Sequence, residues 1–340
     1  MISGSQVKAL YSNCRQCPRN CGADRTSGKA GFCMEDHRLR VSVACLHFGE
    51  EPLITVHNGS GTIFLTGCNL RCAFCQNYQI SQQGMGKELS KEEFAEICLR
   101  LEDAGAENIN LVTPSHHIPK LASGLEEARK QGLKLPVCWN SSGYDSVEML
   151  KMMDGLVTIW LPDFKTLSPA LAKQLCAAEN YPETAVNALK WMIDHNPLNI
   201  IEVEKNGVKK DKMLQGVIIR HLFLPGRFEE TAEVLGWLKE NADGKAIISL
   251  MSQYTPVPFK GTEQELNRRK EALKAIENRL VNKTEDEDLR DLIEAYDFDY
   301  LFYQDLTTDT DWLPDFTRPQ PFSNALAKVI WHWNYGFKSK

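Results

Sequence analysis

Three cysteines lie close together in the sequence, at Cys68, Cys72 and Cys75. They directly follow the short apolar run 62–66, which has the length and composition of a β-strand. Three thiolates at this spacing can bind one face of a cubane iron–sulfur cluster, which normally takes four cysteine ligands. One iron would then have no protein ligand, so the spacing predicts a cluster at which chemistry takes place.

Two other roles for these thiols agree less well with the rest of the chain. Structural zinc takes four nitrogen or sulfur ligands, and no fourth cysteine follows nearby. The 11 cysteines are an odd number, and residues 1–11 are mixed and polar rather than a secretory apolar segment, which argues against disulfides. We therefore expect a cytoplasmic protein whose thiols stay reduced.

The composition is that of an ordinary globular protein, with 43% hydrophobic and 25% charged residues. The net charge of −6 argues against an open surface for polyanions, so we do not expect a nucleic-acid partner. No apolar run approaches the roughly 20 residues that are needed to span a bilayer, so we do not expect a membrane protein. The length of 340 residues suffices for one large core or for two domains.

From residue 90 onward, helical and strand patterns alternate along the chain. A capping box at Ser90 predicts a helix that ends before Gly105, and Pro119 and Gly132 bound a second helix. Other helical patterns cover 146–153, 168–178, 184–195 and 229–241, and 200–210 is typical of a hairpin. Strands are predicted over 62–66, 108–113, 135–139, 156–161, 216–224 and 246–251. This alternation predicts a parallel sheet, either doubly wound or curled into a barrel.

Polar residues stand at the carboxyl ends of the predicted strands, where parallel α/β folds place their ligand contacts. They are Thr113 and Ser115 after the second strand, Asn140 and Ser142 after the third, and Asp163 and Lys165 after the fourth. The fifth strand carries Arg220, which is costly in an apolar strand unless its guanidinium meets an anion. Ordinary turn hydrogen bonds, a surface ion pair at Asp163 and Lys165, and a buried salt bridge at Arg220 are the structural alternatives.

The cysteine loop, with Phe74 before its last cysteine, resembles that of the radical S-adenosylmethionine (SAM) superfamily. The resemblance implies the fold class: α/β, a partial (β/α)6 barrel with a small cysteine-rich N-terminal module and a C-terminal extension. It also implies a 4Fe-4S cluster held by Cys68, Cys72 and Cys75, whose fourth iron chelates the amino acid end of SAM. Reduction would then cleave SAM to methionine and a 5′-deoxyadenosyl radical, which abstracts hydrogen from a substrate.

Most of the chain is similar to a branch of uncharacterised iron–sulfur proteins related to pyruvate formate-lyase activating enzyme. Segments that carry this resemblance include His47 with Gly49-Glu50-Glu51-Pro52, Asn140-Ser141-Ser142-Gly143, Asp163-Phe164-Lys165, and Arg220 with Pro225-Gly226. The chain departs from the activating enzyme in having no Gly-Gly-Glu stretch near Thr113 and no histidine after Tyr254. The SAM-contact candidates are Phe74, Thr113, Ser115, Asn140, Ser142, Asp163, Lys165 and Arg220.

The resemblance implies a radical enzyme that acts on a protein or peptide, with a glycyl radical as one product. It also implies an electron donor such as flavodoxin or ferredoxin. Two alternatives stay open: radical modification of a small metabolite, and a non-catalytic iron–sulfur electron carrier. An electron carrier needs no SAM pocket, so the polar groups at the strand ends argue against the second alternative.

A second group of cysteines precedes the first predicted strand, at Cys14, Cys17, Cys21 and Cys33. Four thiolates that begin with a Cys-x2-Cys pair are typical of a metal site. Zinc or a single iron would stabilise a small module, whereas a second iron–sulfur cluster would relay electrons. We therefore expect a metal-binding module over 1–58, a radical SAM barrel over 59–261, and a helical and aromatic extension over 262–340.

Overall fold

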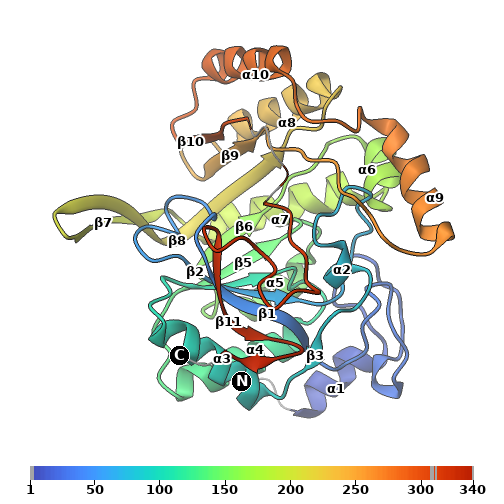
Figure 1. The fold of residues 1–340 in the computed structure, drawn as a ribbon, viewed down its shortest axis with the longest axis vertical. Coiled ribbons are helices and arrows are strands. Elements are labelled where there is room, and N and C mark those ends of the chain that lie inside the picture. The colour runs from blue at the N-terminus through green and yellow to red at the C-terminus, as the bar shows by residue number, and fades with distance from the viewer. Residues whose placement is uncertain (1–3, 307–309, 311, 339–340) are drawn as a thin grey trace.

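The computed structural model describes residues 4–306, 310 and 312–338. Its centre is a parallel sheet in which each predicted strand pairs with the next along the chain. All six predicted strands are confirmed, as β2 (Ser60–Leu65), β4 (Ile109–Val112), β5 (Val137–Ser141), β6 (Ile159–Pro162), β8 (Val208–Leu222) and β9 (Ile247–Met251). The partial barrel expected from the resemblance is therefore the fold of the core (Figure 1).

Helices connect these strands and cover the outer face of the sheet (Figure 1). The predicted capping box is present, since Ser90 accepts from the Glu93 N–H and Glu93 accepts from the Ser90 N–H. Four apolar residues of the helix that follows, spaced for one face, are fully buried: Phe94, Ile97, Cys98 and Leu101. The connecting helices are α3 (Lys91–Asp103), α4 (Ile118–Lys130), α5 (Val147–Leu150), η2 (Lys151–Met153), α6 (Pro169–Cys176), α7 (Tyr181–His195) and α8 (Phe228–Asn241).

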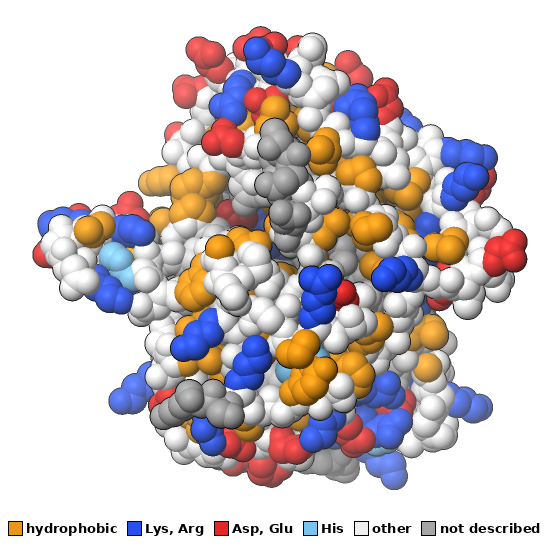
Figure 2. Space-filling view, viewed as in Figure 1, with side chains coloured by type: hydrophobic (Ala, Val, Ile, Leu, Met, Phe, Trp, Pro, Cys, Tyr) orange, Lys and Arg blue, Asp and Glu red, His pale blue; other side chains and the backbone are white. Residues whose placement is uncertain are grey.

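The predicted hairpin is confirmed and belongs to the longest strand of the sheet. Strand β7 (Asn199–Lys205) pairs antiparallel with the first half of β8. Asn206 and Gly207 both have positive φ, at 53° and 77°, as a tight two-residue hairpin turn requires. The hairpin projects from the body with charged side chains on its surface (Figures 1 and 2).

The two flanks of the core add strands to the same sheet, which the sequence did not predict. At one edge, β1 (Arg40–His47) pairs antiparallel with β2, and the aromatic tail forms β11 (Ala327–His332) beside β1. At the other edge, β10 (Leu301–Gln304) pairs parallel with β9. The remaining elements are α1 (Gly4–Ser12), η1 (Arg25–Ser27), α2 (Tyr78–Ser81), β3 (Lys87–Glu88), α9 (Glu263–Ala272), η3 (Leu273–Ala275), α10 (Lys283–Tyr296) and β12 (Gly336–Phe337). The division into domains stays a prediction, and the sheet crosses both of its boundaries.

The loop after β1 closes the end of the barrel at which the parallel strands begin. Because β1 is antiparallel to β2, with His47 opposite Ser60, this loop starts at the amino ends of the parallel strands. Leu53 and Ile54 of the loop join a buried cluster with inward-facing strand residues, among them Cys138, Ile159, Ile218 and Ile247. The loop therefore acts as the floor of the barrel. Among the described residues, no helix has the length and apolarity that crossing a bilayer requires.

Candidate active site

The three-cysteine loop begins directly after β2, at the carboxyl end of that strand. Gly67 starts the loop with φ +75°. A Cβ at Gly67 would lie 2.4 Å from Glu35 Cγ and 2.7 Å from the Cys33 carbonyl oxygen, so only glycine fits there. Two backbone hydrogen bonds join the loop to the end of α6: Ala73 N–H to the Leu175 carbonyl at 2.8 Å, and Arg71 N–H to the Cys176 carbonyl at 3.1 Å. The loop is thus held firmly against the barrel.

The thiols of this loop are partly exposed and none forms a disulfide. Cys72 Sγ lies 3.6 Å from Cys176 Sγ, and the hydrogen bond between the two thiols lowers the pKa of Cys72 to about 7. Burial raises the pKa of Cys68 to about 12 and that of Cys75 above its usual value. Iron binding at these thiols must therefore displace protons, as it does at any cysteine-rich metal site.

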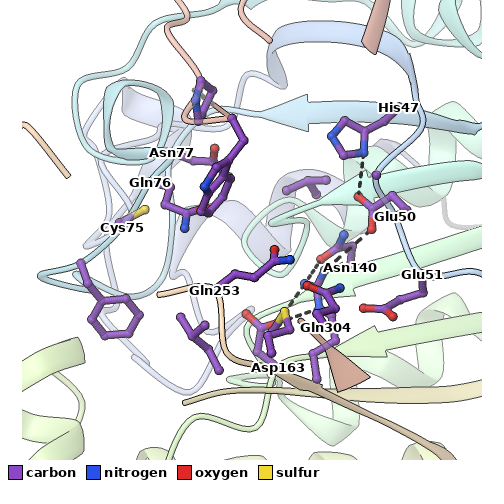
Figure 3. A pocket seen from close by; sticks show the side chains of 18 of the residues that line it. His47, Glu50, Glu51, Cys75, Gln76, Asn77, Asn140, Asp163, Gln253 and Gln304 are labelled. Carbon is purple, nitrogen blue, oxygen red and sulfur yellow. Dashed lines mark hydrogen bonds and ion pairs between the residues drawn. The ribbon is translucent and has the colours of Figure 1, made fainter. Parts of the chain in front are cut away.

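A cavity of about 390 Å³ adjoins the cysteine loop. Cys72, Phe74 and Cys75 line one end of it, and side chains from the interior of the barrel line the rest. Figure 3 shows Cys75, Gln76 and Asn77 on one side of the cavity and the β1 loop on the other. Cys72 and Cys75 border the cavity, so a cluster held by this loop would adjoin it and could present an open iron to a bound ligand.

A charged network crosses the middle of the cavity. Asp163 accepts from Lys165 Nζ at 2.7 Å and from Arg220 Nε at 2.9 Å, while Arg220 Nη2 donates to Asn140 Oδ1 at 2.6 Å. Burial alone would raise the pKa of Asp163, but Arg220 and Lys165 outweigh it and keep that pKa below its usual range. Burial likewise opposes the charge of Lys165, and Asp163 still raises the pKa of that ammonium group. All three groups are therefore charged at neutral pH.

The structure brings five of the eight predicted SAM contacts to the cavity and leaves three outside it. Phe74, Asn140, Asp163, Lys165 and Arg220 line the cavity. Thr113 follows its strand with a positive φ of 61°. Ser115 is buried and forms a side-chain hydrogen bond with Asp145. Ser142 Oγ is buried without a hydrogen bond to any described residue. These three side chains do not line the cavity, and their role in binding SAM stays a prediction.

Several residues of the cavity come from the flanks, where sequence reasoning assigned no role. His47, Glu50 and Glu51 come from β1 and its loop, and Gln304 comes from β10. The segment before β11 contributes apolar walls, since Phe322 packs against Phe64 with ring centroids 5.2 Å apart. Trp312, Pro314, Phe322 and Leu326 line the cavity from this segment. The Gly-Glu-Glu-Pro run was the one available signal, and it carried no indication that its side chains enter the barrel.

The module that holds the four N-terminal cysteines contacts the cysteine loop. Cys14, Cys17 and Cys33 are buried and Cys21 is exposed. A Cβ at Gly31 would lie 3.3 Å from Cys21 Sγ and 3.4 Å from Cys33 Sγ, so these two sulfurs face the same point. The Cys33 carbonyl oxygen accepts a hydrogen bond from the Cys68 N–H at 3.4 Å, which connects this module to the cysteine loop.

No set of three or more His, Cys, Asp or Glu side chains in the described part of the chain is arranged to hold a metal ion. This finding covers both cysteine groups. The predicted zinc or second iron site at Cys14, Cys17, Cys21 and Cys33 therefore stays a prediction.

The model of the radical SAM superfamily matches residues 62–203, which include the cysteine loop and the strands β4, β5 and β6. An uncharacterised protein of Methanocaldococcus jannaschii, MJ0674, is 31% identical over 80% of this chain and 75% of its own length. The chain belongs to the radical SAM superfamily. A second uncharacterised protein of that organism, MJ0808, is 28% identical over 27% of this chain and 32% of its own length.

Two solved structures are similar to this chain at low sequence identity. SuiB of Streptococcus suis bound to S-adenosylmethionine has a TM-score of 0.45 and 13% identity over 70% of this chain. HydG, a maturase of the [FeFe]-hydrogenase, has a TM-score of 0.40 and 14% identity over 69% of this chain. The chain spans about half of either protein, 48% of SuiB and 53% of HydG. Membership of the superfamily implies a 4Fe-4S cluster and SAM as cofactors.

Proposed function

We propose that this protein is a radical SAM enzyme whose reaction takes place in the cavity between the cysteine loop and the barrel floor. The bound cluster and SAM would supply an electron and a 5′-deoxyadenosyl radical that abstracts hydrogen from the substrate. The observation that carries the proposal is that Cys72 and Cys75 share one cavity with Asn140, Asp163, Lys165 and Arg220. An electron carrier has no use for such a cavity.

Different side chains of the cavity would bind different parts of SAM. Lys165 and Arg220 are the cations that line the cavity, and either can bind a carboxylate. Asp163 Oδ and Asn140 Oδ1 accept hydrogen bonds and suit ribose hydroxyls. Phe74 offers an apolar face beside the cysteines. We also propose that the protein works in the cytoplasm and that a flavodoxin or ferredoxin reduces its cluster there.

For the substrate, the resemblance to pyruvate formate-lyase activating enzyme supports a protein or peptide, with a glycyl radical as the product. One observation favours the second candidate, a small molecule. Trp312, Phe322 and Leu326 line the cavity from the C-terminal segment. Phe322 covers the side of the barrel at the end of β1, where its ring packs against His47 with the ring centroids 5.4 Å apart. A protein loop would need that side to be accessible, whereas a small molecule would not.

The test is SAM cleavage by the anaerobically purified, reconstituted protein with dithionite. We expect 5′-deoxyadenosine, measured by chromatography, from the wild type and from Cys98→Ala, whose thiol is buried on α3 away from the cavity. We expect none from Cys72→Ala. A fully loaded cluster that never cleaves SAM would contradict the proposal and favour the electron carrier.

A further inference from the structure

The barrel floor carries an acidic group that the SAM-binding residues do not account for. Glu50 and Glu51 lie in the loop after β1, opposite the cysteine loop, and His47 is the last residue of β1. Figure 3 shows the three side chains together at the end of the cavity away from Cys75. The Ile54 N–H donates to the Glu51 carbonyl at 2.9 Å, which fixes the backbone turn from which both carboxylates project.

Polar atoms of this group lack hydrogen-bond partners among the described residues. Glu51 is 2% exposed, and its Oε1 accepts from Ser249 Oγ at 3.0 Å, but its Oε2 has no partner. His47 Nδ1 is also buried without a hydrogen bond. The Glu50 carboxylate lies 3.8 Å from His47 Nδ1 and 3.8 Å from Arg220 Nη1, beyond hydrogen-bond distance in both cases. A buried polar atom without a partner is costly, so the group is incomplete as it stands.

The charges along the cavity show which partner is missing. Three carboxylates, those of Glu50, Glu51 and Asp163, face two cations, Lys165 and Arg220. Both cations already bind Asp163 at 2.7–2.8 Å. Burial raises the pKa of Glu51 to about 7, Arg220 lowers it in part, and the like charge of Glu50 raises it again. A cation at the floor would offset both the desolvation of Glu51 and its repulsion from Glu50.

SAM is not the ligand that this end of the cavity would take. By the superfamily resemblance, the amino acid end of SAM chelates the open iron, so its ammonium group stays with the cysteines. The lining of the cavity also includes Phe64, Leu222 and Leu326, whose apolar side chains suit an alkyl chain. The floor is therefore left for a second ligand, and it would contact the end of that ligand that lies away from the cysteines.

We propose that Glu51, together with Glu50 and His47, binds the protonated primary amine of the substrate at the floor of the barrel. This inference rests on the proposed function in one respect: the bound amine is called a substrate because the protein is proposed to be an enzyme. The amine would anchor one end of an alkyl chain, and the rest of the chain would extend through the apolar walls toward the cysteines. Glu51 and Glu50 are then residues that determine specificity for a cationic substrate.

The probe is n-butylammonium, titrated by calorimetry into the reconstituted protein with SAM present, and n-butanol is its neutral counterpart. We expect saturable binding of the amine only. Glu51→Gln keeps the shape of the side chain and should weaken binding at least about tenfold, because it removes a charged hydrogen-bond acceptor. Glu50→Gln provides a second variant. Glu202→Gln, an exposed carboxylate on the hairpin, removes the same charge and should bind like the wild type.

Equal binding of n-butanol, unchanged binding by Glu51→Gln, or no binding of either probe would overturn the proposal. A parallel titration with Nα-acetyl-lysine amide separates two sources of the amine. Binding of both amines supports a lysyl side chain as the ligand, and binding of n-butylammonium alone supports a small free amine. Because the titration does not depend on SAM cleavage, its outcome is separate from the assay for 5′-deoxyadenosine.

Discussion

Arg220 Nη2 lies 2.8 Å from Asp163 Oδ1, and this ion pair joins β8 to the carboxyl end of β6. The same two residues form a parallel bridge through their backbones, and the Phe164 N–H donates to the Arg220 carbonyl at 2.7 Å. The side chains that would bind SAM are therefore held by the sheet itself. Their position does not depend on a mobile loop.

Arg220→Leu should weaken SAM binding and lower stability together. The variant leaves Asp163 with Lys165 as its one cation along the cavity, and losing one partner of a partly buried pair costs roughly 1–3 kcal/mol. Calorimetric titration of SAM and urea unfolding measure the two effects. Arg279→Leu breaks the ion pairs of a guanidinium that is 38% exposed, with Glu277 and with the more buried Glu285, and should change stability by about 1 kcal/mol or less, with SAM affinity retained. If Arg220→Leu bound SAM as tightly as the wild type, Arg220 would not be part of the SAM site.

Gly67→Ala should prevent the cysteine loop from holding a cluster. Both the positive φ and the contact of the new Cβ with the Cys33 carbonyl oppose the substitution, at a combined cost of about 2–5 kcal/mol. Iron content after reconstitution is the measurement. Gly28→Ala is the matched control, because Gly28 has φ +84° but nothing within 4 Å of the new Cβ. That control should lose about 1 kcal/mol and keep its iron.

Glu51 should make the protein less stable as the pH rises from about 5 to 7. Its pKa rises from 4.5 in the unfolded chain to about 7 in the folded protein, so in this window the folded state binds more protons. The stability that Glu51 contributes is thus complete below pH 4.5 and is lost as the pH passes 7, by about 3 kcal/mol. Urea unfolding of wild type and Glu51→Gln at several pH values measures this. If the free energy of unfolding changed with pH in the same way in both proteins, the pKa of Glu51 would not be raised by folding.

Cys14→Ser and Cys33→Ser should lower the metal content of the purified protein and its unfolding midpoint. Four thiolates that hold a structural metal contribute directly to the folding of a small module. Metal analysis by mass spectrometry identifies zinc or iron and its ratio to protein. Cys98→Ser, at a buried thiol outside both cysteine groups, should keep the wild-type metal content. If the serine variants also keep it, the predicted N-terminal metal site does not exist.

Local signals in the sequence predicted the core of the fold and its chemical centre. The βα alternation, the Ser90 capping box and the Asn206-Gly207 turn all depend on neighbouring residues, and all are present in the structure. The Cys68, Cys72 and Cys75 spacing likewise lies within one loop. Asp163 and Arg220 line the same cavity because parallel strands bring their carboxyl ends to one edge.

Only the tertiary structure decided what surrounds that centre. Strands β1 and β11 are far apart in the sequence and pair through the sheet, so no local pattern marks them as neighbours. The loop after β1 carries Glu51 within reach of the charge of Arg220, and the segment before β11 packs Phe322 against Phe64. Conversely, Thr113 turns out of its strand with a positive φ and does not reach the cavity. Spacing determines which residues share a loop, whereas long-range pairing and packing determine which loops share a cavity.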